Sequence, residues 1–131
     1  MSELVVDLYS FGYQFSGIPE DLTDNKGGFV FDCRFLPNPG RQPAYFELTG
    51  MDREVEEYLE QFPQLYQFLN NIISIVDMAI SNYKQREFTH LMISFGCTGG
   101  QHRSVYCAER LNVYLLKTGV KVNLNHVEQD K

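Results

Sequence analysis

The chain has 131 residues, which is enough for one globular domain with its own core but not for two. Its formal net charge of −6 opposes the electrostatic attraction on which most nucleic-acid-binding proteins depend. The start lacks the basic and apolar segments of a signal peptide, and no apolar run approaches the roughly 20 residues that cross a bilayer. We therefore expect one cytoplasmic domain over residues 1–131, with no membrane partner.

The cysteine pattern indicates a reducing compartment. Cys33, Cys97 and Cys107 form no CxxC pair, and their odd number leaves one thiol over from any disulfide. The three histidines are scattered along the chain and have no metal-ligand spacing to the cysteines. We therefore expect neither a metal ion nor another cofactor.

The first third of the chain predicts two strands separated by a loop. Residues 4–9 are rich in β-branched and apolar side chains, which is typical of a strand. Residues 11–26 carry glycine, proline and aspartate, which favour a loop. Residues 27–35 contain a short buried strand at 29–32. The next segment, residues 36–40, is stiffened by two prolines.

The middle of the chain predicts two helices. Asp52 is placed to act as the N-cap of the first helix. After Pro63, apolar residues recur at the i, i+3, i+4, i+7 spacing of a helix of about five turns. The members of this stripe are Leu65, Phe68, Leu69, Ile72, Ile73, Val76 and Ile80.

The last third predicts strand, helix, strand. Residues 91–95 form a near-continuous apolar strand of the kind found inside parallel sheets. A helix follows from near His102, with Lys117 in its last turn and Gly119 at its C′ position. Residues 120–127 predict the final strand. This order of elements predicts a single α/β domain with a mostly parallel sheet covered by helices.

A glycine-rich segment between the third strand and the last helix carries the chemistry. It consists of Gly96, Cys97, Thr98, Gly99, Gly100, Gln101, His102, Arg103 and Ser104. Its three glycines permit positive φ and a close approach of backbone N–H groups to a ligand. The helix N-terminus adds unpaired N–H donors and a partial positive charge, and Arg103 offers a planar fork for phosphate. His102 can donate once protonated. We therefore predict a phosphate-binding strand-to-helix loop.

The same segment permits a second interpretation. The spacing Cys97-x5-Arg103 followed by Ser104 matches the loop of cysteine-dependent phosphatases, in which a thiolate attacks phosphorus. Gly96 stands where those phosphatases generally carry histidine. No aspartate lies in an obvious general-acid loop, the candidates being Asp21, Asp24 and Asp32. A phosphatase with Cys97 as nucleophile stays the alternative.

Longer blocks of sequence resemble a known bacterial family. The matching blocks are residues 10–13, 17–19, 31–39, 48–50 with Asp52, and 96–105. Arg-Phe-Leu-Pro-Asn-Pro at residues 34–39 and Gly-Cys-Thr-Gly-Gly-Gln-His-Arg-Ser-Val at residues 96–105 are the most specific of them. In these blocks the chain resembles the C-terminal domain of the RapZ family of RNase adapter proteins.

The resemblance implies a non-catalytic regulatory domain that binds an amino-sugar phosphate such as glucosamine-6-phosphate. It also implies that Asp32, Arg34 and Asn38 lie near the 96–104 segment, at the ends of neighbouring strands. In this family it implies contacts with a small regulatory RNA and with partner proteins.

Three departures limit what the resemblance carries over. No segment matches the G-x-x-x-x-G-K-[ST] loop of the family's N-terminal domain, so nucleotide hydrolysis is not expected. Gly40 stands where relatives can carry histidine, which removes one ligand contact. Residues 123–131 form an acidic tail in place of a basic one, so RNA binding is disfavoured and His126 is expected to be an ordinary strand-end residue.

These observations predict a metabolite-sensing adapter domain whose ligand is a phosphorylated small molecule. The expected ligand-binding residues are Asp32, Arg34, Asn38, Cys97, Thr98, Gly99, Gly100, Gln101, His102, Arg103 and Ser104. The cysteine phosphatase and an RNA-binding adapter are the alternatives. A protein partner and self-association as a homo-oligomer both stay open.

Overall fold

Four parallel strands form a single sheet in the computed structural model, which describes residues 3–129. The strands are β1 (Val5–Gly12), β2 (Phe29–Asp32), β3 (His90–Cys97) and β4 (Lys121–His126). The helices are α1 (Arg53–Leu59), α2 (Pro63–Gln85) and α3 (Arg103–Lys117), preceded by two 3₁₀ turns, Pro39–Arg41 and Pro43–Tyr45. Residues 1–2 and 130–131, which belong to the predicted domain and tail, lie outside the described residues.

The register of the sheet brings distant residues to one edge. The strand order is β2-β3-β1-β4, and every pair is parallel. Gly12 lies beside Cys97, Asp32 beside Gly96, and Ser10 beside His126. Because all four strands run in the same direction, their carboxyl ends share one edge of the sheet. Ligands of open α/β sheets bind at this edge.

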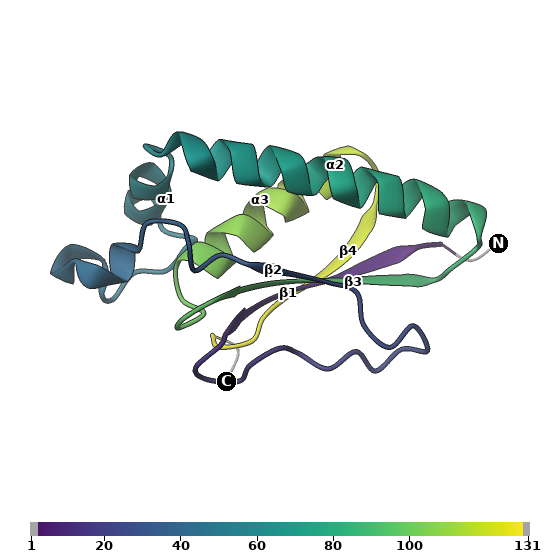
Figure 1. The fold of residues 1–131 in the computed structure, drawn as a ribbon, viewed down its shortest axis with the longest axis horizontal. Coiled ribbons are helices and arrows are strands. Elements are labelled where there is room, and N and C mark those ends of the chain that lie inside the picture. The colour runs from purple at the N-terminus through teal and green to yellow at the C-terminus, as the bar shows by residue number, and fades with distance from the viewer. Residues whose placement is uncertain (1–2, 130–131) are drawn as a thin grey trace.

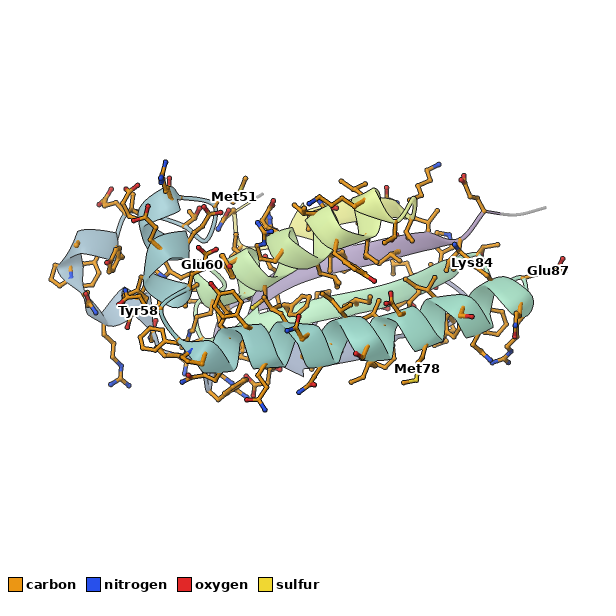
Figure 2. The ribbon with its side chains drawn as sticks, turned by 90° about the horizontal axis from the view of Figure 1, so that it is seen from above. Met51, Tyr58, Glu60, Met78, Lys84 and Glu87 are labelled. Atoms are coloured by element: carbon orange, nitrogen blue, oxygen red, sulfur yellow. The ribbon has the colours of Figure 1, made fainter. Side chains whose placement is uncertain are left out.

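The helices cover only one face of the sheet. Figure 1 shows α2 and α3 above the sheet, with the loop between β1 and β2 running along the opposite side. Figure 2 looks down on the helical layer, in which α2 and α3 lie along the sheet and α1 lies near one end. Parallel sheets usually carry helices on both faces. Here the irregular residues 13–28 take the place of the second helical layer.

The core lies between the sheet and the helices. It is built from fully buried side chains that include Val6 and Leu8 of β1, Ile93 of β3, and Val76 and Leu111 of the two long helices. Each such side chain contributes about 1.5–3 kcal/mol of hydrophobic free energy when removed from water. This core fixes α3 against the sheet, and with it the position of the segment that joins β3 to α3.

The elements follow the predicted order, with shifted boundaries. The predicted loop at residue 11 is wrong for Phe11 and Gly12, which extend β1 by pairing with Gly96 and Cys97. Asp52 is the N-cap residue of α1, but its carboxylate accepts from the backbone N–H of Thr49 at 2.8 Å instead of capping the helix. The first difference arises because the partners of Phe11 and Gly12 are distant in sequence and outweigh local propensity. The second is a local contact, since Thr49 lies three residues before Asp52.

Two findings bear on the predicted environment. All three cysteines are buried and unpaired. No helix within residues 3–129 is long and apolar enough to cross a membrane.

Candidate functional site

A cavity of about 330 Å³ opens at the carboxyl edge of the sheet, beside the N-terminus of α3. Its walls come from the β3–α3 connection and from the segment around the two 3₁₀ turns. The lining residues are Asn38, Gly40, Phe46, Cys97, Thr98, Gly99, Gln101, His102 and Arg103. The volume suits a small metabolite, since ligand pockets occupy about 300–1,000 Å³.

The β3–α3 connection presents unpaired donors. The backbone N–H groups of residues 98–102 donate to no other group in residues 3–129. The 15-residue helix α3 begins directly after them, so its own first N–H groups and its dipole point the same way. Such a run of free amides at a helix N-terminus is suited to an anion.

The glycines of this segment serve different purposes. All three glycines permit positive φ, but of these only Gly100 adopts it, at +70°. Gly96 lies within β3 against the rings of Phe11 and Tyr13, which leave no room for a Cβ atom. A Cβ at Gly12 would lie 2.7 Å from the backbone of Gly99. Close packing therefore explains Gly96 of this segment and Gly12 of β1, and backbone conformation explains Gly100.

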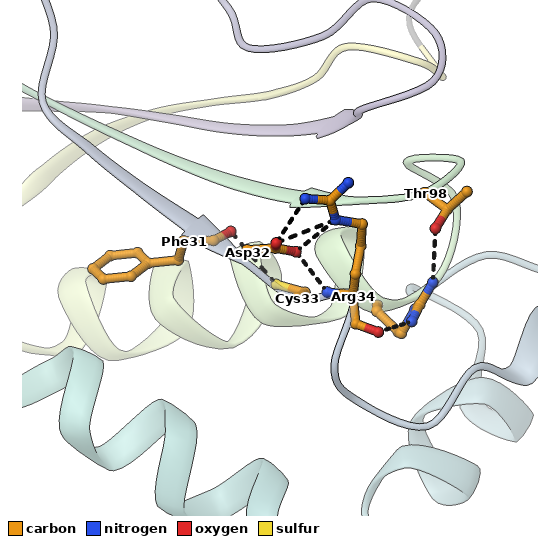
Figure 3. A network of polar contacts seen from close by, with 6 residues as sticks. Phe31, Asp32, Cys33, Arg34 and Thr98 are labelled. Carbon is orange, nitrogen blue, oxygen red and sulfur yellow. Dashed lines mark hydrogen bonds and ion pairs between the residues drawn. The ribbon is translucent and has the colours of Figure 1, made fainter.

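Arg103 is a buried cation without an ion-pair partner. Its residue surface is 4% exposed, and its Nη1 donates to the carbonyl oxygens of Arg34 at 2.7 Å and Leu36 at 3.0 Å. Nη2 reaches the hydroxyl of Thr98 at 3.5 Å (Figure 3), and among residues 3–129 the buried Nε has no partner. Among residues 3–129, no carboxylate lies within ion-pair distance of this guanidinium. A buried charge is costly unless an opposite charge approaches it, so the site favours an anion.

Asp32 and Arg34 form an ion pair outside the cavity. Arg34 Nη2 lies 2.8 Å from the Asp32 carboxylate (Figure 3). The guanidinium also lies 3.8 Å above the ring of Tyr13. The hydrogen bonds from Arg34 hold the pKa of Asp32 below its usual value, and the nearby charge of Arg103 lowers this pKa further. Because the Arg34 carbonyl accepts from Arg103, the pair helps to fix the segment that holds the buried cation.

Gln101 and His102 hold the opposite wall in place. Gln101 Nε2 donates to the carbonyl oxygens of Phe46 at 2.8 Å and Leu48 at 2.7 Å. His102 Nε2 lies 2.8 Å from the carbonyl oxygen of Tyr45, which can only accept. Nε2 therefore carries the proton, and Nδ1 is the nitrogen left for a ligand.

Cys97 and Ser104 contact each other at the base of the site. The Cys97 thiol donates to Ser104 Oγ at 3.1 Å, and the Ser104 backbone N–H donates to the same sulfur at 3.4 Å. Cys97 lines the cavity, whereas Ser104 is fully buried behind it. This is the relation between nucleophile and hydroxyl that the phosphatase interpretation requires.

The structure brings most of the predicted residues together. Seven line the cavity, namely Asn38, Cys97, Thr98, Gly99, Gln101, His102 and Arg103. Arg34 lines a neighbouring cavity instead, while Asp32, Gly100 and Ser104 line neither. Sequence reasoning missed Phe46, whose position after a proline-rich segment carried no chemical signal. Within residues 3–129, no three His, Cys, Asp or Glu side chains group as metal ligands would.

The fold and this cavity define a small parallel α/β domain with a cationic site at the strand-to-helix junction. Residues 4–130 match the family described as the RapZ C-terminal domain. The chain therefore belongs to this family, and the resemblance predicted from its sequence blocks is confirmed.

Three relatives support the assignment, each named a nucleotide-binding protein. One from Solibacter usitatus is 39% identical over 95% of this chain and 37% of its own length. One from Thermotoga neapolitana is 39% identical over 96% of this chain and 43% of its own length. One from Clostridium acetobutylicum is 38% identical over 98% of this chain and 42% of its own length. The chain spans about two fifths of the length of these relatives.

Proposed function

We propose that this domain is a non-catalytic, adapter-type regulatory module that binds a phosphorylated small metabolite in the cavity beside Arg103. The buried Arg103 guanidinium carries the proposal, because residues 3–129 supply it with neutral oxygen acceptors and no carboxylate. A phosphate would provide the missing negative charge.

The phosphate would lie against the N-terminus of α3. The free N–H groups of residues 98–102 surround this position, and Thr98 adds a hydroxyl. Each charge-assisted hydrogen bond contributes about 1.5–3 kcal/mol, against an association cost on the order of 4–15 kcal/mol. Several such bonds give roughly micromolar to millimolar affinity, which suits a metabolite sensor. The family resemblance favours glucosamine-6-phosphate as the specific ligand.

Calorimetric titration tests this function directly. The domain is titrated with glucosamine-6-phosphate, glucose-6-phosphate and inorganic phosphate. Arg103→Met is expected to abolish binding, whereas Arg110→Met, an exposed arginine on the same helix, is expected to bind as the wild type does. Thr98→Val gives a second site variant in case Arg103→Met fails to fold. Unchanged affinity in both site variants would refute the assignment.

The contact between Cys97 and Ser104 supports the cysteine phosphatase as a second candidate. The Cys97 thiol lines the cavity, where it could attack a phosphate. The hydroxyl of Ser104 lies 3.1 Å from the sulfur, where it could assist the thiolate as it leaves. A general acid is the weak point, because Asp32 is paired with Arg34 and Asp21 accepts from Thr23 and Gly27. Asp24 lies in a separate cavity beside the start of β3.

Hydrolysis of an aryl phosphate between pH 5 and 8 separates the two candidates. Turnover that disappears in Cys97→Ser would establish the phosphatase. Tight phosphate binding without turnover would refute the phosphatase and support the regulatory module.

A further inference from the structure

Two hydrogen-bond acceptors converge beside Gly40 in the cavity next to Arg103. Asn38, Gly40 and His102 all line this cavity. A Cβ atom at residue 40 would lie 3.0 Å from Asn38 Oδ1 and 3.4 Å from His102 Nδ1. Both atoms therefore border the space that the glycine leaves open, and a small donor group placed there is within hydrogen-bond reach of both.

Backbone contacts fix both atoms as acceptors. Asn38 Oδ1 accepts from the N–H of Gly40 at 2.9 Å, which sets the orientation of the amide and leaves the oxygen a second lone pair. The carbonyl oxygen of Tyr45 can only accept, so in the neutral ring of His102 the proton lies on Nε2. Nδ1 then has a free lone pair, and it has no hydrogen-bond partner among residues 3–129.

The position proposed for the phosphate is lined by donors instead. These donors are the free N–H groups of residues 98–102 and the guanidinium of Arg103. The acceptor pair beside Gly40 contributes nothing to holding a phosphate. It suits another group of the same ligand, one that donates hydrogen bonds, and no carboxylate lines the cavity to compete for that group.

The number of hydrogens on the donor group decides which group fits the pair. A hydroxyl has one hydrogen, so it donates to Asn38 or to His102 and leaves the other acceptor unpaired. An ammonium group has three hydrogens and donates to both, with the added strength of a charge-assisted bond. Because an unpaired acceptor away from water is costly, the pair favours an ammonium group over a hydroxyl.

We propose that Asn38 Oδ1 and His102 Nδ1 bind the amino group of an amino-sugar phosphate, in the space that Gly40 leaves open. The inference rests on the proposed function, since the phosphate of the same ligand must lie at the N-terminus of α3. Asn38 and His102 then determine the specificity for an amine, and they do so as neutral acceptors without a carboxylate.

Titration with three sugar phosphates that differ at one carbon tests the inference. Glucosamine 6-phosphate is expected to bind about tenfold more tightly than glucose 6-phosphate, because one more charge-assisted hydrogen bond forms. N-acetylglucosamine 6-phosphate has one hydrogen on its acetamido nitrogen and is expected to bind no more tightly than glucose 6-phosphate.

Two variants act on the pair in opposite directions. Gly40→Ala fills the space between the acceptors at a residue without positive φ, so it is expected to remove most of the tenfold gain and leave glucose 6-phosphate nearly unchanged. Asn38→Asp keeps the acceptor for the Gly40 N–H and adds a negative charge, so it is expected to raise the preference for the amine to about a hundredfold. Asn71→Asp, which places the same charge on an exposed part of α2, is the matched control and is expected to leave the preference unchanged.

The outcomes separate this inference from the proposed function. Failure of every sugar phosphate to bind would overturn both. Equal affinities of the wild type for glucosamine 6-phosphate and glucose 6-phosphate would overturn the amine site and leave the proposed function standing. An amine preference that persists in Gly40→Ala, or that does not rise in Asn38→Asp, would also overturn the amine site.

Discussion

Two buried polar side chains near the carboxyl edge of the sheet have opposite surroundings. His126 at the end of β4 is 8% exposed, and both of its ring nitrogens have partners. Nδ1 lies 2.6 Å from Ser10 Oγ, and Nε2 lies 2.6 Å from a carboxylate oxygen of Glu109. Arg103 is 4% exposed, but its guanidinium donates hydrogen bonds only to neutral oxygens and has no ion-pair partner among residues 3–129.

This difference distinguishes a buried polar side chain that stabilises the fold from one that belongs to a binding site. A fully satisfied buried network fixes the elements that it joins, which for His126 are β1, β4 and α3. A buried cation with no counter-ion lowers stability, and such a residue is retained where a ligand supplies the missing charge. His126 therefore has a structural role, and its interpretation as an ordinary strand-end residue misses this network.

The largest expected effect is on binding at Arg103. Arg103→Met should weaken phosphate binding by about a thousandfold, since two charge-assisted bonds are lost. The free energy of unfolding should change by less than about 2 kcal/mol, because the buried charge is removed together with its hydrogen bonds. Calorimetry and urea denaturation measure the two quantities on one preparation. If Arg103→Met lost stability but kept its phosphate affinity, Arg103 would have a structural role like that of His126.

His126→Leu should show the reverse pattern. It leaves Ser10 and Glu109 without their buried partner, so the free energy of unfolding should fall by about 3 kcal/mol. Phosphate affinity should stay unchanged, because His126 does not line either cavity. Asn125→Ala, at an exposed neighbouring position, should shift the urea midpoint little. Lost phosphate binding in folded His126→Leu protein would argue against a purely structural network.

Tyr106 gives a smaller, pH-dependent test of a satisfied pair. Burial, followed by the 2.7 Å hydrogen bond to Glu60, raises the pKa of Tyr106 above its ordinary value of 10.0. This stabilisation is complete below pH 10 and is lost as the pH rises, because the unfolded chain then releases the proton first. The free energy of unfolding should fall by about 1.4 kcal/mol per pH unit above pH 10, and Tyr106→Phe should remove this contribution. Parallel stability curves for the two proteins would contradict it.

The smallest effect is expected for the Asp32–Arg34 ion pair. Because both side chains are about half exposed, solvent screens the pair, and Asp32→Asn should change stability less than His126→Leu does. The lowered pKa of Asp32 means that its contribution is present above the ordinary carboxyl value and is lost as the pH falls through the lowered one. Phosphate affinity should fall no more than about threefold, since Asp32 does not line the cavity. A larger loss of phosphate affinity would indicate that Asp32 contacts the ligand.

Local sequence determined the strand and helix order and the chemistry of the β3–α3 connection. Apolar periodicity places α2 and α3. Six of the residues that line the cavity fall within residues 97–103, so their shared location needs no tertiary information. The family blocks added Asn38, which lines the same cavity. The single helical layer and the all-parallel register were beyond local patterns, because both depend on which strands pair.

Only the tertiary structure decided what each predicted residue does. Gln101 is separated by more than 50 residues from the carbonyl oxygens of Phe46 and Leu48 to which it donates. Arg103 becomes a buried cation without an ion-pair partner only when the segment after β2 folds over it. Propensity and periodicity act over a few residues, whereas burial and the pairing of charges depend on contacts between distant segments.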